Sequence, residues 1–149
     1  SDPSQTPHTL MIPFLPGTDI TVLTNGISHI NQLVALDIPC IMVGGSIKKT
    51  TNSCIGPITE TTLRTLYFSK CFLGANGFSI TSGITNHDIN ERVIKLLALN
   101  NSCQPYFLID HTKYGIVTMV QIANLDQYPI LIDEIPEDLE NYKNFILCE

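Results

Sequence analysis

The sequence predicts an α/β fold built on a mainly parallel sheet. Its strand-like segments, such as 38–45 and 70–77, are near-continuous apolar runs that alternate with amphipathic segments of helical periodicity. Strands of this kind are buried on both faces, because the helices that connect parallel strands cover the sheet on each side. Glycines and polar residues follow the apolar runs, at the strand ends where α/β proteins bind ligands.

Length and composition indicate one domain over residues 1–149, without an internal repeat or linker. The chain is 44% hydrophobic and 15% charged, which excludes a disordered regulator. No apolar run is long enough to span a bilayer, and the first residues lack the basic, apolar pattern of a signal peptide, so we expect a soluble, cytoplasmic protein without membrane association. The formal net charge of -6 argues against direct binding to DNA, which usually requires a basic face.

The first half of the chain contains two strand–helix pairs. A short β-branched strand over 20–24 precedes a helix over 26–37. An apolar strand over 38–45 then leads to a helix over 56–68, which begins with Gly-Pro, so that Pro57 takes the first helical position.

The second half continues the same alternation. The best helix covers 87–100, with Asp88 as its N-cap and Glu91 three residues later, and its predicted buried face is Ile89, Val93, Leu96 and Leu97. The other predicted elements are strands over 70–77, 104–110 and 129–134, an edge strand over 116–122 and a short acidic helix over 136–145.

Cysteine and histidine spacing predicts no metal site. The five cysteines are widely spaced and contain no C-x-x-C pair, which is typical of a reduced, cytosolic protein without disulfides. The four histidines have no metal-ligand spacing either. No nucleophile elbow or activated cysteine is evident, so no catalytic residue and no cofactor is predicted.

Each candidate motif has an ordinary structural explanation when it is considered alone. Gly74-x-x-Gly77 is neither a dinucleotide fingerprint nor a Walker A loop, and it is either a phosphate-binding loop or a turn that requires positive φ. Glu91 and Lys95 have the spacing of a surface ion pair on a helix. The segment 110–113 follows a buried strand, and its ordinary explanation is a solvated turn.

The order of these motifs is more specific than any one of them. The sequence contains "VLTN", an apolar strand into "GG", "FLGANG", "GIT" followed by "ERVIK", then "DHTKYG" and "ILIDE". This order resembles the C-terminal effector domain of DeoR-type transcriptional repressors over residues 2–134. The resemblance implies a Rossmann-like, three-layer fold similar to ribose-5-phosphate isomerase and glucosamine-6-phosphate deaminase.

The resemblance also implies the residues of a binding site for a phosphorylated sugar. The family's first phosphate loop corresponds to residues 2–6, where Gln5 replaces a hydroxyl, and Asn86 replaces the second threonine of a Thr-Thr step. The implied ligand-binding residues are Asp2, Ser4, Thr6, Asn25, Gly44, Gly45, Gly74, Gly77, Thr85, Glu91, Lys95, Asp110 and Lys113.

The leading expectation is therefore a non-catalytic sensor of a phosphorylated sugar. We expect it to relay that signal to a helix-turn-helix, located before Asp2 in a longer protein, which binds operator DNA, and to form a homodimer or larger assembly. The alternative is a sugar-phosphate isomerase or deaminase of the related fold, with Glu91 or Asp110 as its base. A nucleotide-binding domain is a third, weaker possibility.

Overall fold

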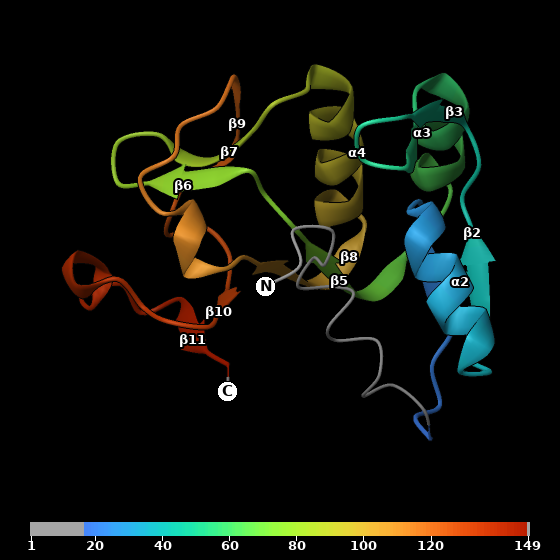
Figure 1. Cartoon of the computed structure of the whole chain (residues 1–149), viewed down its shortest axis with the longest axis horizontal. Helices are drawn as coiled ribbons and strands as arrows, with labels where there is room; N and C mark the ends of the chain where they lie inside the picture. Colours follow the sequence, from blue (N-terminus) through green and yellow to red (C-terminus); the bar gives the residue numbers. More distant parts are fainter. Residues whose placement is uncertain (1–16, 149) are drawn as a thin grey trace. The chain divides into compact units, whose positions relative to one another are not determined.

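A computed structural model describes residues 17–148 of the chain (Figure 1). The chain divides into two compact units, of which unit 1 ends at Leu66 and unit 2 begins at Tyr67. Among the described residues, no helix is both long enough and apolar enough to cross a membrane.

Unit 1 begins with a parallel strand–helix–strand element. Strand β1 (Val22–Thr24) pairs in parallel with β2 (Cys40–Met42), and α2 (Ile27–Ala35) connects them. Leu33, on α2, is fully buried and packs with Ile38, which precedes β2. The sequence places Ile27, Ile30, Leu33 and Val34 on one helical stripe, and this prediction is only partly correct, because the side chain of Val34 is 65% exposed.

A hairpin and a helix complete unit 1. Strands β3 (Ser46–Lys48) and β4 (Ser53–Ile55) pair in antiparallel fashion, and α3 (Pro57–Arg64) follows with its proline at the predicted position. The hairpin was not expected from the sequence. Its strands are three residues long, which is too short to give a period-2 pattern.

Unit 2 contains a four-stranded sheet in which every strand pair is parallel. Its order is β11 (Phe145–Leu147), β10 (Ile130–Ile132), β8 (Ser102–Leu108) and β5 (Phe68–Leu73). Helix α4 (Ile89–Asn100) lies between β5 and β8 in the chain and contacts both strands (Figure 1). The α/β class with a mainly parallel sheet is confirmed, in agreement with a Rossmann-like fold.

A second, antiparallel sheet in unit 2 carries the segments that follow β5 and precede β10. Strands β6 (Gly77–Ser79), β7 (Gly83–Asn86) and β9 (Val120–Ala123) pair in the order β6-β7-β9. The predicted strand over 116–122 is thus an edge strand, as expected, but it begins at Val120. The core of unit 2 includes the fully buried Phe78, Phe107 and Ile130.

The predicted buried face of α4 is largely wrong, although Leu96 does pack against the core. The buried residues of the helix are Ile94, Ala98 and Leu99, whereas Ile89 is 54% exposed. Apolar residues lie on several sides of this helix, so periodicity alone did not identify the side that faces the sheet.

The predicted helix over 136–145 is also wrong. This segment forms only a single 3₁₀ turn, η3 (Glu137–Leu139), and then leads into β11. Leu139 is its fully buried residue, and the Asn144 amide donates to the Leu125 and Tyr128 carbonyl oxygens at 2.8 Å each. These long-range contacts fix an irregular path that helical propensity does not predict.

Candidate functional site

The carboxyl ends of three parallel strands in unit 2 form one polar edge, as the sequence predicts. The registers Leu73↔Phe107 and Leu131↔Leu108 bring the ends of β5, β8 and β10 to the same side of the sheet. The residues that follow these ends are Gly74, Asp110 and Asp133. Ligands of open α/β sheets bind at such an edge.

The loop Gly74–Gly77 is held to its surroundings by backbone and side-chain hydrogen bonds. The Asn76 N–H donates to the Thr85 carbonyl oxygen at 3.1 Å, and the Asn76 side-chain oxygen accepts from the His87 N–H at 2.9 Å. Gly77 is buried, and a Cβ at this position would overlap the Ile116 carbonyl oxygen. Gly77 is thus required by close backbone approach rather than by the positive φ that a turn alone suggested.

Glu91 and Lys95 both interact with Asn86, the last residue of β7. The Asn86 amide nitrogen donates to Glu91 Oε2 at 3.1 Å, and its amide oxygen accepts from Lys95 Nζ at 3.3 Å. Lys95 Nζ also donates to the Gly74 carbonyl oxygen at 2.7 Å. Gly74, Glu91 and Lys95 are therefore brought together by a residue that the sequence marked only as a departure from the family pattern.

Thr85, which was expected to bind ligand, has its hydroxyl engaged inside the protein. The residue is 2% exposed, and its Oγ1 donates to the Gly77 carbonyl oxygen at 3.4 Å. The same atom accepts from the Thr118 N–H at 3.0 Å and lies 2.9 Å from Thr118 Oγ1. Thr85 joins the glycine loop to the segment before β9, and no sequence signal pointed to Thr118.

Asp110 builds the turn that carries Lys113. Its carboxylate accepts from the Thr112 N–H at 2.9 Å and from the Thr112 hydroxyl, which caps the 3₁₀ turn η2 (His111–Lys113). The Lys113 N–H donates to the Asp110 carbonyl oxygen at 3.1 Å. Within residues 17–148, Lys113 makes none of the observed ion pairs, although its side chain is half-buried.

His111 and Asp133 form an ion pair at the same edge. His111 Nδ1 lies 2.8 Å from Asp133 Oδ2, and the His111 N–H donates to Asp133 Oδ1 at 2.8 Å. The hydrogen bond to Asp133 raises the pKa of His111 above its usual value, with smaller help from the neighbouring carboxylates. Burial by itself raises the pKa of Asp133, but the hydrogen bonds from His111 outweigh it and lower that pKa.

The implied site residues of unit 1 also follow strand ends. Asn25 follows β1, and its side-chain amide donates to the Cys54 carbonyl oxygen at 2.9 Å. Gly44 and Gly45 follow β2, where the buried Thr59 hydroxyl donates to the Gly44 carbonyl oxygen at 2.7 Å and would overlap a Cβ at Gly45. These residues hold the local loops of unit 1 in place.

His29 is a residue of this region that the sequence analysis missed. Its Nδ1 lies 3.3 Å from Thr24 Oγ1, which also accepts from the Gly26 N–H at 3.0 Å. Burial lowers the pKa of His29 below its usual value, which favours the neutral imidazole. The sequence did offer one signal for His29, because this residue lies near the start of a predicted helix that follows a strand end.

Asp2, Ser4 and Thr6 lie outside the described residues. No group of three or more His, Cys, Asp or Glu side chains among residues 17–148 is arranged to hold a metal ion.

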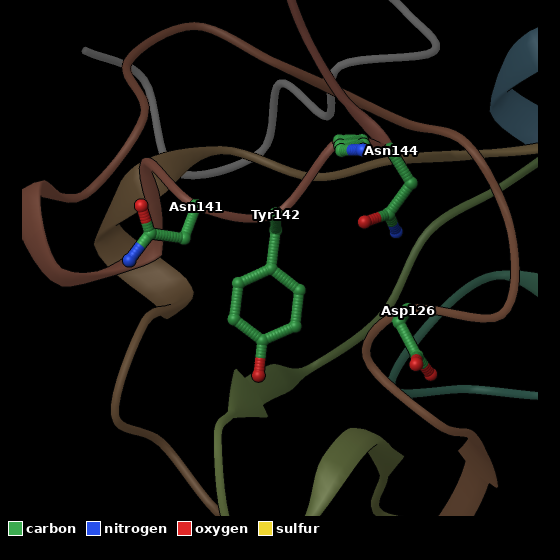
Figure 2. Close-up of a pocket in the computed structure, with 5 residues that line it drawn as sticks. Asp126, Asn141, Tyr142 and Asn144 are labelled. Atoms are coloured by element: carbon green, nitrogen blue, oxygen red, sulfur yellow. The ribbon is translucent and has the colours of Figure 1, made fainter.

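A depression in unit 2 lies at the opposite edge of the sheet. It has a volume of about 370 Å³ and is lined by Asp126, Asn141, Tyr142, Lys143 and Asn144 (Figure 2). Ile130 is the first residue of β10, and its N–H donates to the Asn144 carbonyl oxygen. Because Asn144 lines the depression, the depression lies at the amino end of β10. It is wide open to solvent and contains none of the residues that the sequence singled out.

The chain is similar to known regulatory proteins over most of its length. Residues 2–134 match the family model described as the DeoR C-terminal sensor domain. The chain is 32% identical over 135 residues to an uncharacterized HTH-type transcriptional regulator, FruR, of Bacillus subtilis, covering 89% of this chain and 54% of that protein. It is 32% identical over 126 residues to the HTH-type transcriptional regulator IolR of the same organism, covering 84% and 50%.

A third relative is the lactose phosphotransferase system repressor of Staphylococcus aureus. The identity is 27% over 152 residues, which cover 89% of this chain and 59% of the repressor. The chain thus spans about half the length of the curated relatives it matches.

Proposed function

Because the chain belongs to the family of DeoR C-terminal sensor domains, we propose that its effector is a phosphorylated sugar. The observation that carries this proposal is Lys113, a half-buried lysine at the carboxyl edge of the parallel sheet that makes none of the ion pairs observed within residues 17–148. An ammonium group in partly excluded water interacts more strongly with a phosphate than a solvated lysine does.

The backbone around Lys113 supports a role for the side chain itself. The N–H groups of His111, Thr112 and Lys113 donate to Asp133, Asp110 and Asp110, respectively. Because these N–H groups are engaged, the Lys113 ammonium is the group of this turn that would contact phosphate. The Gly74–Gly77 loop, at the neighbouring strand end, would close over the sugar.

A thermal-shift screen tests the proposal. The panel contains hexose, pentose and glycerol phosphates together with the same molecules without phosphate. A ligand present at about 100 times its dissociation constant stabilises the folded state by about 2.7 kcal/mol. We expect at least one phosphorylated compound to raise Tm while its unphosphorylated counterpart does not. A folded protein whose Tm responds to neither set would contradict the proposal.

We propose that this sensing involves no catalysis. The two candidate bases are engaged in structure: Glu91 accepts from the Asn86 amide, and Asp110 holds the turn that carries Lys113. The relatives named above are transcriptional regulators. NMR spectra of an aldose phosphate and a ketose phosphate incubated with the protein should remain unchanged. Isomerisation that disappears in Glu91→Gln would instead favour an enzyme.

We further propose that a helix-turn-helix elsewhere in the full-length protein contacts operator DNA, and that the protein acts in the cytoplasm as a homodimer or larger assembly. The net charge of -6 disfavours DNA contact by this chain itself. A dimer would place two helix-turn-helix modules on a palindromic operator. Light scattering of the chain should give at least twice the monomer mass, and a monomer at high concentration would show that this part does not assemble the protein.

A further inference from the structure

Asn86 is a buried polar residue that joins three separate elements of unit 2. It is the last residue of β7 and is 1% exposed. Both halves of its amide are engaged, by Lys95 and by Glu91, one turn apart on α4. Lys95 continues the connection to the Gly74 carbonyl oxygen, immediately after β5.

The chemistry of the three side chains fixes the arrangement. A lysine ammonium has only donors and an ionised carboxylate has only acceptors, whereas an amide offers both. The amide oxygen of Asn86 must therefore face Lys95, and its nitrogen must face Glu91. A charge-assisted hydrogen bond of 2.7 Å then attaches Lys95 to the loop.

We propose that Asn86 is a positioning residue that, with Glu91 and Lys95, holds the Gly74–Gly77 loop in the conformation that receives the effector. In this account Glu91 and Lys95 act on the loop rather than on the ligand. The role in effector binding rests on the proposed function, but the order of the loop can be measured without any ligand.

A charge exchange within the network provides the test. In Asn86→Asp, a new carboxylate lies about 3 Å from Glu91, and repulsion between the two like charges weakens the network. The double variant Asn86→Asp with Glu91→Gln moves the carboxylate to position 86 and the amide to position 91. The amide at position 91 can then donate to the carboxylate at position 86, and that carboxylate can also accept from Lys95.

Hydrogen exchange of the Asn76 and His87 amides reports the order of the loop without ligand, because the Asn76 N–H donates from the loop to the Thr85 carbonyl oxygen and the His87 N–H donates to the Asn76 side chain. We expect at least tenfold faster exchange in Asn86→Asp and near wild-type exchange in the double variant. Binding of inorganic phosphate, followed by NMR, should weaken and recover in parallel. Asn31→Asp, on the exposed side of α2, makes the same charge change and should alter neither quantity.

Two results would overturn the inference: unchanged exchange in Asn86→Asp, or a double variant that exchanges as fast as the single variant or fails to fold. If wild-type protein bound no phosphate and no phosphorylated sugar, the proposed function would fail, and the exchange measurements would still decide whether Asn86 holds the loop.

Discussion

Lys113 is the single residue whose replacement should affect effector binding most directly. Lys113→Ala removes the ammonium but leaves the turn, because Asp110 caps that turn through the backbone N–H and the hydroxyl of Thr112. We expect binding of the phosphorylated sugar found in the screen to weaken at least tenfold, about 1.4 kcal/mol. Calorimetric titration measures the change.

Lys143→Ala provides the matched control for this experiment. Lys143 is an exposed lysine beside the depression at the amino end of the sheet, so its removal changes the net charge equally. The affinity of Lys143→Ala for the phosphorylated sugar should equal that of wild type. Equal affinities for the two variants would remove Lys113 from the site.

His29 should make the stability of unit 1 depend on pH. Burial lowers its pKa in the folded state, so the unfolded state binds a proton first as the pH falls below about 6.5. The stabilisation from neutral His29 is therefore present above that pH and is lost as the pH falls toward the lowered pKa. Urea unfolding at pH 7.5 and 5.5 measures the difference.

His29→Gln removes the titrating group while retaining a polar side chain, so its stability should fall less between these two pH values. His87→Gln, at an exposed histidine, is the control and should behave like wild type. The same pH dependence in wild type and His29→Gln would contradict the role of burial at this site.

Residue types and spacing predicted that Gly74 and Asp110 follow strand ends at one edge of the sheet in unit 2, but not what each side chain contacts. Thr85 was expected to bind ligand, yet its hydroxyl interacts with Thr118, which lies 33 residues away in sequence. Asn86 appeared to be the loss of a hydroxyl and is instead the centre of a network. Such partners depend on the pairing of distant strands, which no local pattern specifies.

At the scale of elements, the glycine loop depends on close packing against the segment that precedes β9. Gly77→Ala places a methyl group against the Ile116 carbonyl oxygen, so one backbone segment must move. Forced overpacking typically costs about 1–3 kcal/mol. We expect Gly77→Ala to lower the free energy of unfolding by that amount, as measured by chemical denaturation.

Gly44→Ala is the appropriate comparison, because a Cβ at Gly44 meets no atom within 4 Å. It should unfold at nearly the wild-type denaturant concentration. If Gly77→Ala were equally harmless, the close approach between the loop and Ile116 would not be a constraint in solution.

Long elements were predictable from sequence, whereas a three-residue strand was predicted only where it lies within a longer apolar run, as β1, β2 and β10 do. Helix α4 appears where its periodicity and cap indicate, with the Asp88 carboxylate accepting from the Asn90 and Glu91 N–H groups. The hairpin of β3 and β4 and the last strand, β11, were missed. Each of these strands has three residues, and each is defined by its partner rather than by its own pattern.

At the scale of the whole molecule, the α/β class followed from the alternation of apolar runs with amphipathic segments, and the family followed from the order of the motifs. One family model spans residues 2–134, which include parts of both compact units. Under the proposed function, the choice among phosphorylated sugars would depend on the shape of the site, which no motif encodes.

The central claim is that the effector binds at the carboxyl edge of the parallel sheet rather than in the depression at its amino edge. The most direct measurement is the change in backbone amide NMR shifts when the phosphorylated sugar from the screen is added to the labelled chain. We predict the largest changes at residues 74–77 and 110–113, with little change at Asp126 and residues 141–144. Changes concentrated at Asp126 and residues 141–144 would place the ligand at the opposite edge and contradict the account.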